Sequence, residues 1–320
     1  MSQKSKGYFS YAGFIPMFLK NYGVGPTIRA CYYFNYRRLK QPSLKLKTKQ
    51  IVNANGYKMY VIPDDPGISS ELRIFGTHEP LTTELTLQEL KQDMVCLDIG
   101  SNIGYYALLE SKAVGKNGKV IAIEPSPKNF EYLKQNIELH DIKNIQAYNF
   151  AVGDNDNEIK FVISKLSNLC YVPSDEESIS ESAEVIKIPL KRIDTFVLEK
   201  KIDRIDFIRM DVEGYEVKLF EGMWDTLRKY KPLIQMEFHK GLLNSHDALE
   251  FLIKLKKAGY EVKHFVPKEL DRAIIGKITE IPKLHKKIDE IINMIKKNQI
   301  GDVFILFLEN KKKLLAVGGS

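Results

Sequence analysis

The chain has 320 residues, of which 44% are hydrophobic and 28% are charged. This composition fits one globular domain with appendages and excludes a wholly disordered protein. No run approaches the ~20 apolar residues of a transmembrane helix, and the first twenty residues lack the pattern of a secretory signal. The three cysteines, Cys31, Cys96 and Cys170, are odd in number and far apart, which excludes a disulfide framework and a zinc cluster and favours a reducing, cytoplasmic location.

Positive charge is concentrated near the N-terminus. Residues 1–63 hold eleven Lys or Arg and no Asp or Glu, whereas residues 64–320 hold 37 basic and 41 acidic side chains. Residues 1–45 also carry ten aromatic side chains. A basic aromatic extension of this kind predicts peripheral contact with an anionic membrane. The alternatives are an extension packed on the domain with a solvated basic face, and a surface that stacks on single-stranded nucleic acid, which the acidic body disfavours.

The predicted elements begin with a hairpin and a helix in residues 46–90, because Asn55-Gly56 separates two apolar runs. From residue 91 to 310 strand and helix patterns alternate. The predicted strands are 94–99, 119–124, 144–150, 206–210, 233–238, 260–265 and 303–308, and the predicted helices include 105–112, 127–140 and 248–258. Apolar strands separated by helices indicate an α/β fold with a largely parallel sheet covered on both faces.

Residues 266–300 interrupt this alternation, and residues 311–320 form a tail. Between residues 281 and 295 apolar side chains recur every three or four positions, with lysines between them, which predicts an amphipathic helix. This insertion before the last strand is interpreted as a lid, a partner helix or a substrate-recognition element. The equally open alternative is a helix that covers the edge of the sheet.

Polar residues follow the first two strands of the alternating region. In a parallel sheet, ligands bind at the carboxyl ends of the strands. The run 98–104 reads DIGSNIG, and Asn102 stands where a dinucleotide-binding fingerprint has its middle glycine. Glu124 ends the next strand, where a carboxylate can accept hydrogen bonds from ribose hydroxyls. Together they predict a nucleoside site; the alternative is that the glycines shape a turn and Glu124 caps the following helix.

The run 95–104 resembles motif I of class I S-adenosylmethionine-dependent methyltransferases. Four further segments, EPSP at 124–127, AVGD at 151–154, DVEGYE at 211–216 and EFH at 237–239, make the set similar to the FkbM family of methyltransferases over about residues 50–265. The resemblance implies a Rossmann-like sheet of seven strands, mostly parallel with the last strand antiparallel, and S-adenosylmethionine as the cofactor.

The resemblance also implies which residues contact the cofactor. Asp98 is expected near the amino group of its methionine moiety, Glu124 at its ribose and Asp211 beside its sulfonium. The full implied set is Glu79, Asp98, Gly100, Ser101, Asn102, Gly104, Glu124, Ala151, Asp154 and Asp211.

Methyl transfer to a hydroxyl needs an aligned acceptor and a base that removes its proton. The candidates are Asp211, Glu213, Glu237 and His239, with His239 first because the ordinary pKa of histidine suits proton transfer near neutral pH. The alternatives are a surface or helix-capping His239, and carboxylates that hold substrate or pair with Arg209. No metal is predicted, because the sequence identifies no third ligand beside the nearby carboxylates.

The absence of one motif limits the class of molecule that can accept the methyl group. No Asn-Pro-Pro-Tyr or Asp-Pro-Pro-Tyr follows the fourth strand, which disfavours methylation of a base nitrogen. The resemblance to the FkbM family favours O-methylation, so it implies an O-methyltransferase that acts on a hydroxyl or carboxyl of a glycan, a lipid-linked sugar or a related small molecule. The alternatives are a nucleic-acid methyltransferase and a cofactor-binding module without turnover.

Overall fold

The computed structural model describes residues 49–63, 65–164, 167, 170–173, 184–243, 245–272 and 286–311, with scattered positions between 15 and 35. The basic aromatic segment 1–45 therefore lies outside the described residues apart from those positions. The same holds for residues 273–285 of the insertion and for the tail from 312 onward.

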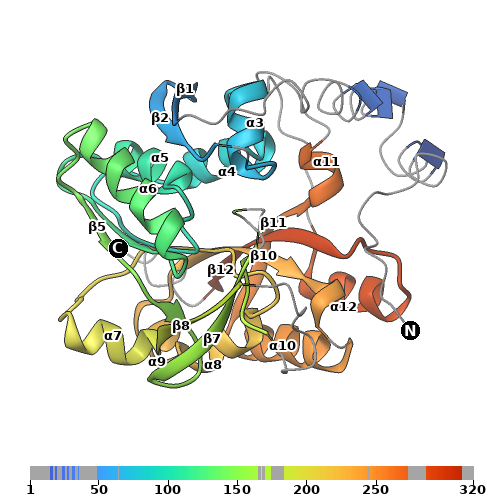
Figure 1. The fold of residues 1–320 in the computed structure, drawn as a ribbon. Helices are drawn as coiled ribbons and strands as arrows, with labels where there is room; N and C mark the ends of the chain where they lie inside the picture. Colours follow the sequence, from blue (N-terminus) through green and yellow to red (C-terminus); the bar gives the residue numbers. More distant parts are fainter. Residues whose placement is uncertain are drawn as a thin grey trace.

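A seven-stranded sheet in the order β11-β12-β10-β9-β3-β4-β5 forms the centre of the molecule (Figure 1). Its strands are β3 (Val95–Ile99), β4 (Lys119–Ile123), β5 (Ile145–Tyr148), β9 (Phe207–Met210), β10 (Leu233–His239), β11 (Tyr260–Pro267) and β12 (Val303–Asn310). Strand β12 is antiparallel to both β10 and β11, and the other pairs are parallel. The Rossmann-like sheet with an antiparallel last strand is thus confirmed.

Helices cover both faces of this sheet (Figure 1). One face carries α3 (Ile68–Phe75), α4 (Pro80–Glu89), α5 (Tyr105–Val114), α6 (Pro127–Leu139) and the short α11 (Lys268–Arg272). The other carries α7 (Ile193–Glu199), α8 (Glu216–Glu221), α9 (Trp224–Tyr230), α10 (Ser245–Lys257) and α12 (Ile288–Lys296). A short 3₁₀ helix, Lys240–Leu242, follows β10.

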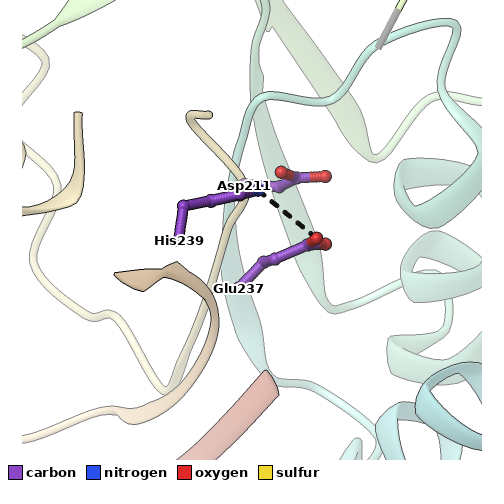
Figure 2. A group of neighbouring side chains, drawn as sticks. All are labelled: Asp211, Glu237 and His239. Carbon is purple, nitrogen blue, oxygen red and sulfur yellow. Dashed lines mark ion pairs between the residues drawn. The ribbon is translucent and has the colours of Figure 1, made fainter. Parts of the chain in front are cut away.

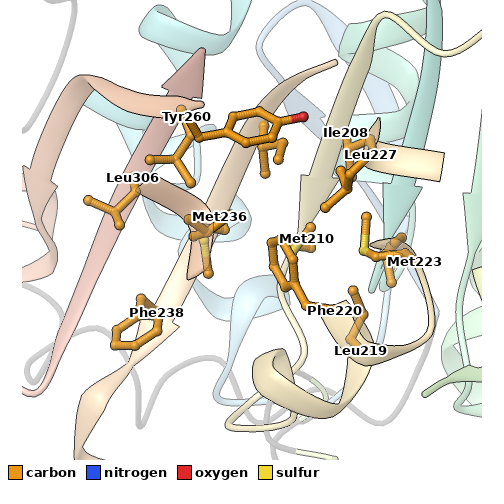
Figure 3. Close-up of a cluster of buried hydrophobic side chains, with 14 of the residues drawn as sticks. Ile208, Met210, Leu219, Phe220, Met223, Leu227, Met236, Phe238, Tyr260 and Leu306 are labelled. Atoms are coloured by element: carbon orange, nitrogen blue, oxygen red, sulfur yellow. The ribbon is translucent and has the colours of Figure 1, made fainter. Parts of the chain in front are cut away.

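The two faces of the central strands differ in polarity. Side chains alternate between the faces of a strand, and those facing α7–α10 form an apolar core that includes Ile208, Met210 and Met236 (Figure 3). On the opposite face Asp98, Arg209 and Gln235 are aligned on β3, β9 and β10, where the sheet register pairs them as neighbours. A row of polar groups therefore crosses the middle of the sheet beneath α4 and α5.

The hairpin predicted around Asn55-Gly56 is present as β1 (Gln50–Ala54) and β2 (Tyr57–Val61). Both turn residues have positive φ, 46° and 86°, as the favoured two-residue hairpin turn requires. A second, smaller sheet has the order β6 (Ala151–Val152), β8 (Glu184–Lys191) and β7 (Asn157–Ile163). None of these three strands was predicted from the sequence; the nearest predicted strand, 144–150, ends just before β6.

The described end of the insertion packs on the sheet. Helix α12 buries Ile288, Ile291, Ile292 and Ile295 in the core beside α10. For the described residues of the insertion, this agrees with the alternative that the helix covers the sheet.

Among the described helices, none is long and apolar enough to cross a membrane.

Candidate active site

A pocket that is partly open to solvent lies at the carboxyl ends of β3, β4 and β9. We call it the strand-end pocket. Its polar lining includes Gly100, Asn102, Glu124, Asp211 and Glu213. Its apolar lining includes Ile123, Phe150, Ala151, Val152, Phe161 and Val172 from β4, the small sheet and their connections. The position is the one at which this type of sheet binds ligands.

Glu124 is buried at the floor of the pocket, with 4% of its surface exposed. Its Oε2 accepts a hydrogen bond from the amide of Asn102 at 2.8 Å, and its Oε1 accepts from the amide of Ser126 at 2.9 Å and from Nδ2 of Asn129 at 3.3 Å. Burial raises the pKa of Glu124 to about 7, although these hydrogen bonds oppose the shift. A carboxylate offers about four acceptor positions, so room remains for a ligand hydroxyl.

Gly100 and Gly104 are required by contacts within the protein. Gly100 has a φ of +81°, and a Cβ there would lie 2.0 Å from the backbone oxygen of Asp211. Gly104 has a φ of +93°, and a Cβ there would lie 2.7 Å from Leu133 Cδ1. The interpretation that these glycines shape a tight turn is therefore supported, and Gly100 brings the loop after β3 against the loop after β9.

The structure separates the predicted cofactor residues into two groups. Those that line the strand-end pocket are Gly100, Asn102, Glu124, Ala151 and Asp211, and those outside its lining are Glu79, Asp98, Ser101, Gly104 and Asp154. The carboxylate of Asp154 accepts a hydrogen bond from Lys218 at 3.0 Å instead. The hydroxyl of Ser101 donates to the backbone oxygen of Asp98 at 2.9 Å and stabilises the turn.

Arg209 bridges two of the predicted carboxylates. Its Nη1 donates to Oδ1 of Asp98 at 3.0 Å and its Nη2 to Oδ2 of Asp211 at 3.3 Å. The guanidinium also lies over the ring of Tyr106, 4.0 Å from the ring centroid. Asp98 is fully buried. Asp211 is therefore paired with Arg209, as one of the alternatives proposed, and it also lines the pocket.

His239 lies among four carboxylates, and we call the group of Asp211, Glu213, Glu216, Glu237 and His239 the His239 cluster. Figure 2 shows three of its members, Asp211, Glu237 and His239. Nδ1 of His239 is 2.6 Å from Oε1 of Glu216. Nε2 is 3.3 Å from Oε2 of Glu213 and 3.4 Å from Oε1 of Glu237. Glu237 and His239 share a face of β10 because they are two residues apart. All four predicted catalytic residues are therefore brought together.

Burial alone would lower the pKa of His239, but hydrogen bonds and charge interactions with Glu216 and Glu237 outweigh it and raise the pKa well above its ordinary value. A protonated imidazole has no lone pair to accept a proton, which weakens the prediction of His239 as the base. Burial, followed by the charge of Glu237, raises the pKa of Asp211 to about 6. Burial, followed by the charge of Asp211, raises the pKa of Glu213 to about 8.

Glu79 belongs to a neighbouring ion-pair chain and not to the pocket wall. Lys268 bonds both Glu79 and Glu237, the latter at 2.6 Å. Oε2 of Glu79 accepts a hydrogen bond from the hydroxyl of Tyr106 at 2.8 Å. Burial would raise the pKa of Glu79, but Lys268 and His78 hold it well below its ordinary value. Glu79 and Glu213 both have positive φ, 46° and 49°, a strained conformation for glutamate that is typical of functional sites.

Several residues of this site were not predicted from the sequence, namely Lys268, Tyr106, His78 and Glu216. Lys268 immediately follows β11, at a strand end, which is the signal that could have identified it. Asp65 and Ser167 were also missed. The amide and hydroxyl of Ser167 donate to Asp65, and its backbone oxygen accepts from Asn102 and Asn129. Ser167 therefore connects the segment that contains Asp65 with the loop after β3 and with helix α6 beside the pocket.

Comparison with known proteins gives a consistent result. Residues 98–262 match the family described as the methyltransferase FkbM domain. A hexuronic acid methyltransferase, AglP of Haloferax volcanii, is 27% identical over 161 residues, which cover 49% of this chain and 61% of the relative. A 2-O-methyltransferase, NoeI of Sinorhizobium fredii, is 26% identical over 182 residues, which cover 51% of this chain and 72% of that protein. The structure of the FkbM methyltransferase of Methylobacillus flagellatus matches with a TM-score of 0.39 and 16% identity, covering 68% of this chain and 44% of the other.

Proposed function

The chain belongs to the FkbM methyltransferase family, and from this premise we propose that it transfers a methyl group from S-adenosylmethionine to a hydroxyl of a sugar-containing acceptor. The observation that carries the proposal is the position of Asp211 and Glu213. Both line the strand-end pocket and both belong to the His239 cluster. A cofactor in the pocket and an acceptor at the cluster would therefore meet at these two residues.

The cofactor of this methyltransferase family is S-adenosylmethionine, which supplies an electrophilic methyl group when bound. The residues present fit this molecule. Glu124 offers a carboxylate for the ribose, and the side chains of Ile123, Phe150 and Val172 offer an apolar wall for the adenine ring. Asp98 is fully buried and does not line the pocket, so its expected contact with the amino group of the methionine moiety stays a prediction.

Methylation of a hydroxyl releases its proton, and this proton would have to pass to the protein. We assign Asp211 to receive it, because Asp211 lines the pocket and its Oδ1 has no hydrogen-bond partner among the described residues. A pKa of about 6 keeps this carboxylate ionised at neutral pH. His239, already held by Glu216, would position the carboxylates.

The acceptor class rests on the chemistry of the cluster and on the relatives. Carboxylates accept hydrogen bonds from the hydroxyls of a sugar, and two relatives are named a hexuronic acid methyltransferase and a 2-O-methyltransferase. The test is incubation of the full-length protein with S-adenosylmethionine carrying an isotopically labelled methyl group and a panel of hexuronate-containing glycans, neutral glycans and RNA. We expect mass spectrometry to find the label on a sugar oxygen. Label in RNA and in no sugar would favour a nucleic-acid methyltransferase, and no transfer at all would favour a binding module.

Glu124 gives the sharpest test of cofactor binding. We expect Glu124→Ala to weaken S-adenosylmethionine binding by roughly 1.5–3 kcal/mol, the scale of hydrogen bonds to a charged group. The affinity of the unaltered protein should fall as the pH drops through about 7, since ribose hydroxyls donate to the ionised carboxylate and protonation removes that acceptor. Calorimetry at pH values above and below about 7 measures this change in the affinity for S-adenosylmethionine.

The matched control for Glu124 is Glu131→Ala on α6, where the side chain is 57% exposed and pairs with Lys134. This variant should bind the cofactor as the unaltered protein does. The variant Glu124→Gln should lose the pH dependence. An unchanged affinity in Glu124→Ala would contradict the assignment of this residue to the ribose.

We also propose that residues 1–45 contact an anionic membrane and bring the site to a lipid-linked acceptor. The support is the composition of this segment, with ten aromatic side chains and no acidic ones. Each basic residue near such a surface contributes about 1 kcal/mol, screened within a Debye length. Co-sedimentation with phosphatidylserine vesicles should therefore be strong at low salt and weak by about 0.5 M. Equal failure on anionic and neutral vesicles would contradict the proposal.

A further inference from the structure

Three side chains of the His239 cluster have the geometry of a metal site. One atom each from Asp211, Glu237 and His239 can be chosen so that all three lie within 4.8 Å of one another. Two oxygen ligands of one Mg²⁺, each at about 2.1 Å, are at most about 4.2 Å apart. Figure 2 shows that the carboxyl groups of Asp211 and Glu237 project to the same side from neighbouring segments. The observed spacing of the three chosen atoms exceeds this limit for one ion by at most about 0.6 Å.

The orientation of His239 matches that of a metal-binding histidine. Its Nδ1 is 2.6 Å from the carboxylate of Glu216, a residue with no exposed surface. A carboxylate on one ring nitrogen fixes the ring and leaves the other nitrogen for the metal. That other nitrogen, Nε2, faces Glu213 and Glu237 at 3.3 and 3.4 Å. An unprotonated Nε2 would direct its lone pair at two carboxylates, so the arrangement needs a proton or a cation at this point.

The cluster also has more acceptors and more negative charge than the described residues satisfy. Oδ1 of Asp211 and Oε2 of Glu216 are buried and receive no hydrogen bond within the described structure. The carboxylates connected by ion pairs around the site are Glu79, Asp98, Asp211, Glu213, Glu216 and Glu237. The cations that the structure places among them are Arg209, Lys268 and His78, whose pKa Glu79 and Glu71 raise to about 10 although burial opposes the shift. Buried carboxylates without compensating charge are costly, and a divalent cation beside Asp211 and Glu237 would add to this compensation.

We propose that Asp211, Glu237 and His239 bind a divalent cation of the Mn²⁺ and Mg²⁺ class at the acceptor side of the strand-end pocket. Carboxylate oxygens with one imidazole favour these ions over those that prefer thiolates. The role of the ion rests on the proposed function. Bound to the acceptor hydroxyl, it would orient the oxygen toward the methyl group and lower the pKa of that hydroxyl. With the ion bound, Asp211 would serve as a ligand, and the proton would pass to Glu213, the pocket-lining carboxylate that is not a ligand.

The test uses the full-length protein without a histidine tag and Mn²⁺ as the probe, in the absence of cofactor and acceptor. Electron paramagnetic resonance follows the loss of the free Mn²⁺ signal during a titration. We expect one equivalent to bind. We expect Glu216→Gln to weaken this binding about 10–100-fold, the usual effect of losing a carboxylate that supports a ligand, and Asp211→Asn, Glu237→Gln and His239→Gln to weaken it at least as much. Mg²⁺ should compete for the same site.

The matched control is Glu89→Gln. The carboxylate of Glu89 is 2.7 Å from His264 and 2.7 Å from Lys263. The substitution therefore removes a carboxylate from a similar group of histidine and lysine away from the pocket. This variant should bind Mn²⁺ as the unaltered protein does. Mn²⁺ should also raise the unfolding temperature of the unaltered protein, by mass action on the folded state, and not that of Glu237→Gln. Circular dichroism checks the fold of every variant. If another ligand variant is unfolded, the isosteric Glu237→Gln still tests whether the site binds Mn²⁺.

The outcomes separate the metal site from the proposed function. No Mn²⁺ binding, or binding that persists in both Asp211→Asn and Glu237→Gln, would overturn the metal site and leave a protonated His239 within an ion-pair network. Methyl transfer that continues at full rate after chelation, with no bound metal detected, would also overturn it while the function stands. Stoichiometric Mn²⁺ binding without methyl transfer to any acceptor would support the site and contradict the function.

Discussion

Replacing His239 with alanine is expected to lower the rate of methyl transfer about 10²-fold, the scale of a lost positioning contact, while the affinity for S-adenosylmethionine stays nearly unchanged. The reason is its position. His239 does not line the strand-end pocket, but its ring nitrogens contact Glu213, Glu216 and Glu237, so its loss rearranges the acceptor side and leaves the cofactor side intact. Single-turnover kinetics with labelled cofactor measure the rate, and calorimetry measures the affinity.

The matched control is His264→Ala, which removes a histidine paired with Glu89 at 2.7 Å, outside the cluster. Its rate should equal that of the unaltered protein. Loss of cofactor binding in His239→Ala, with the fold intact by circular dichroism, would reassign His239 to the cofactor pocket. An unchanged rate would remove it from the reaction. Either result would also weaken the assignment of the neighbouring Asp211 as the proton acceptor.

The central sheet could be predicted because most of its strands are short apolar runs, several of them with a carboxylate at or just after the end. Asp98 and Glu124 mark the ends of β3 and β4, and the carboxyl ends of parallel strands share one edge of the sheet, so the place of the pocket followed from the sequence. The small sheet was harder to recognise. In β7 and β8 exposed polar and buried apolar residues are mixed, which gives no continuous apolar run.

The ion pairs of the site could not be predicted, because they join residues far apart in the chain. Lys268 reaches Glu79 across 189 residues, and this depends on Asp271, which accepts hydrogen bonds from the amides of Leu81 and Thr82 at the start of α4. No local pattern encodes that contact. The raised pKa of His239 could not be predicted for the same reason, since the ordinary pKa of histidine says nothing about the carboxylates that long-range packing places around it.

Gly100 shows how one residue can support two interpretations. The sequence alone suggested a glycine that admits a ligand, whereas the structure shows that a Cβ there would collide with the backbone of Asp211. The two are connected. By bringing the loop after β3 against the loop after β9, Gly100 holds Asp211 at the boundary between the pocket and the His239 cluster, which is where a methyl group and its acceptor would have to meet.

Replacing Arg209 with methionine is expected to reduce the free energy of unfolding by about 3–5 kcal/mol, the usual loss when one partner of a buried ion pair is removed. Arg209 is 5% exposed, and its guanidinium lies between Asp98, which has no exposed surface, and Asp211. Methionine fills part of the space but leaves both carboxylates without their cation. Urea denaturation of the full-length protein measures the change through the transition midpoint.

The control is Arg204→Met. Arg204 pairs with Asp206 at 2.7 Å, but its side chain is 56% exposed, so its loss should cost no more than about 1 kcal/mol.

The loss of unfolding free energy in Arg209→Met should shrink as the pH falls toward about 5. Without its cation a buried carboxylate has a raised pKa in the folded state, so the folded state takes up a proton before the unfolded state does and gains stability as the pH drops. A second replacement, Asp98→Asn, should recover part of the loss at neutral pH, since it removes one of the two stranded charges. A loss in Arg209→Met no greater than that in Arg204→Met would mean that water reaches Asp98 and Asp211, and that the row of charges across the sheet is not sealed from solvent.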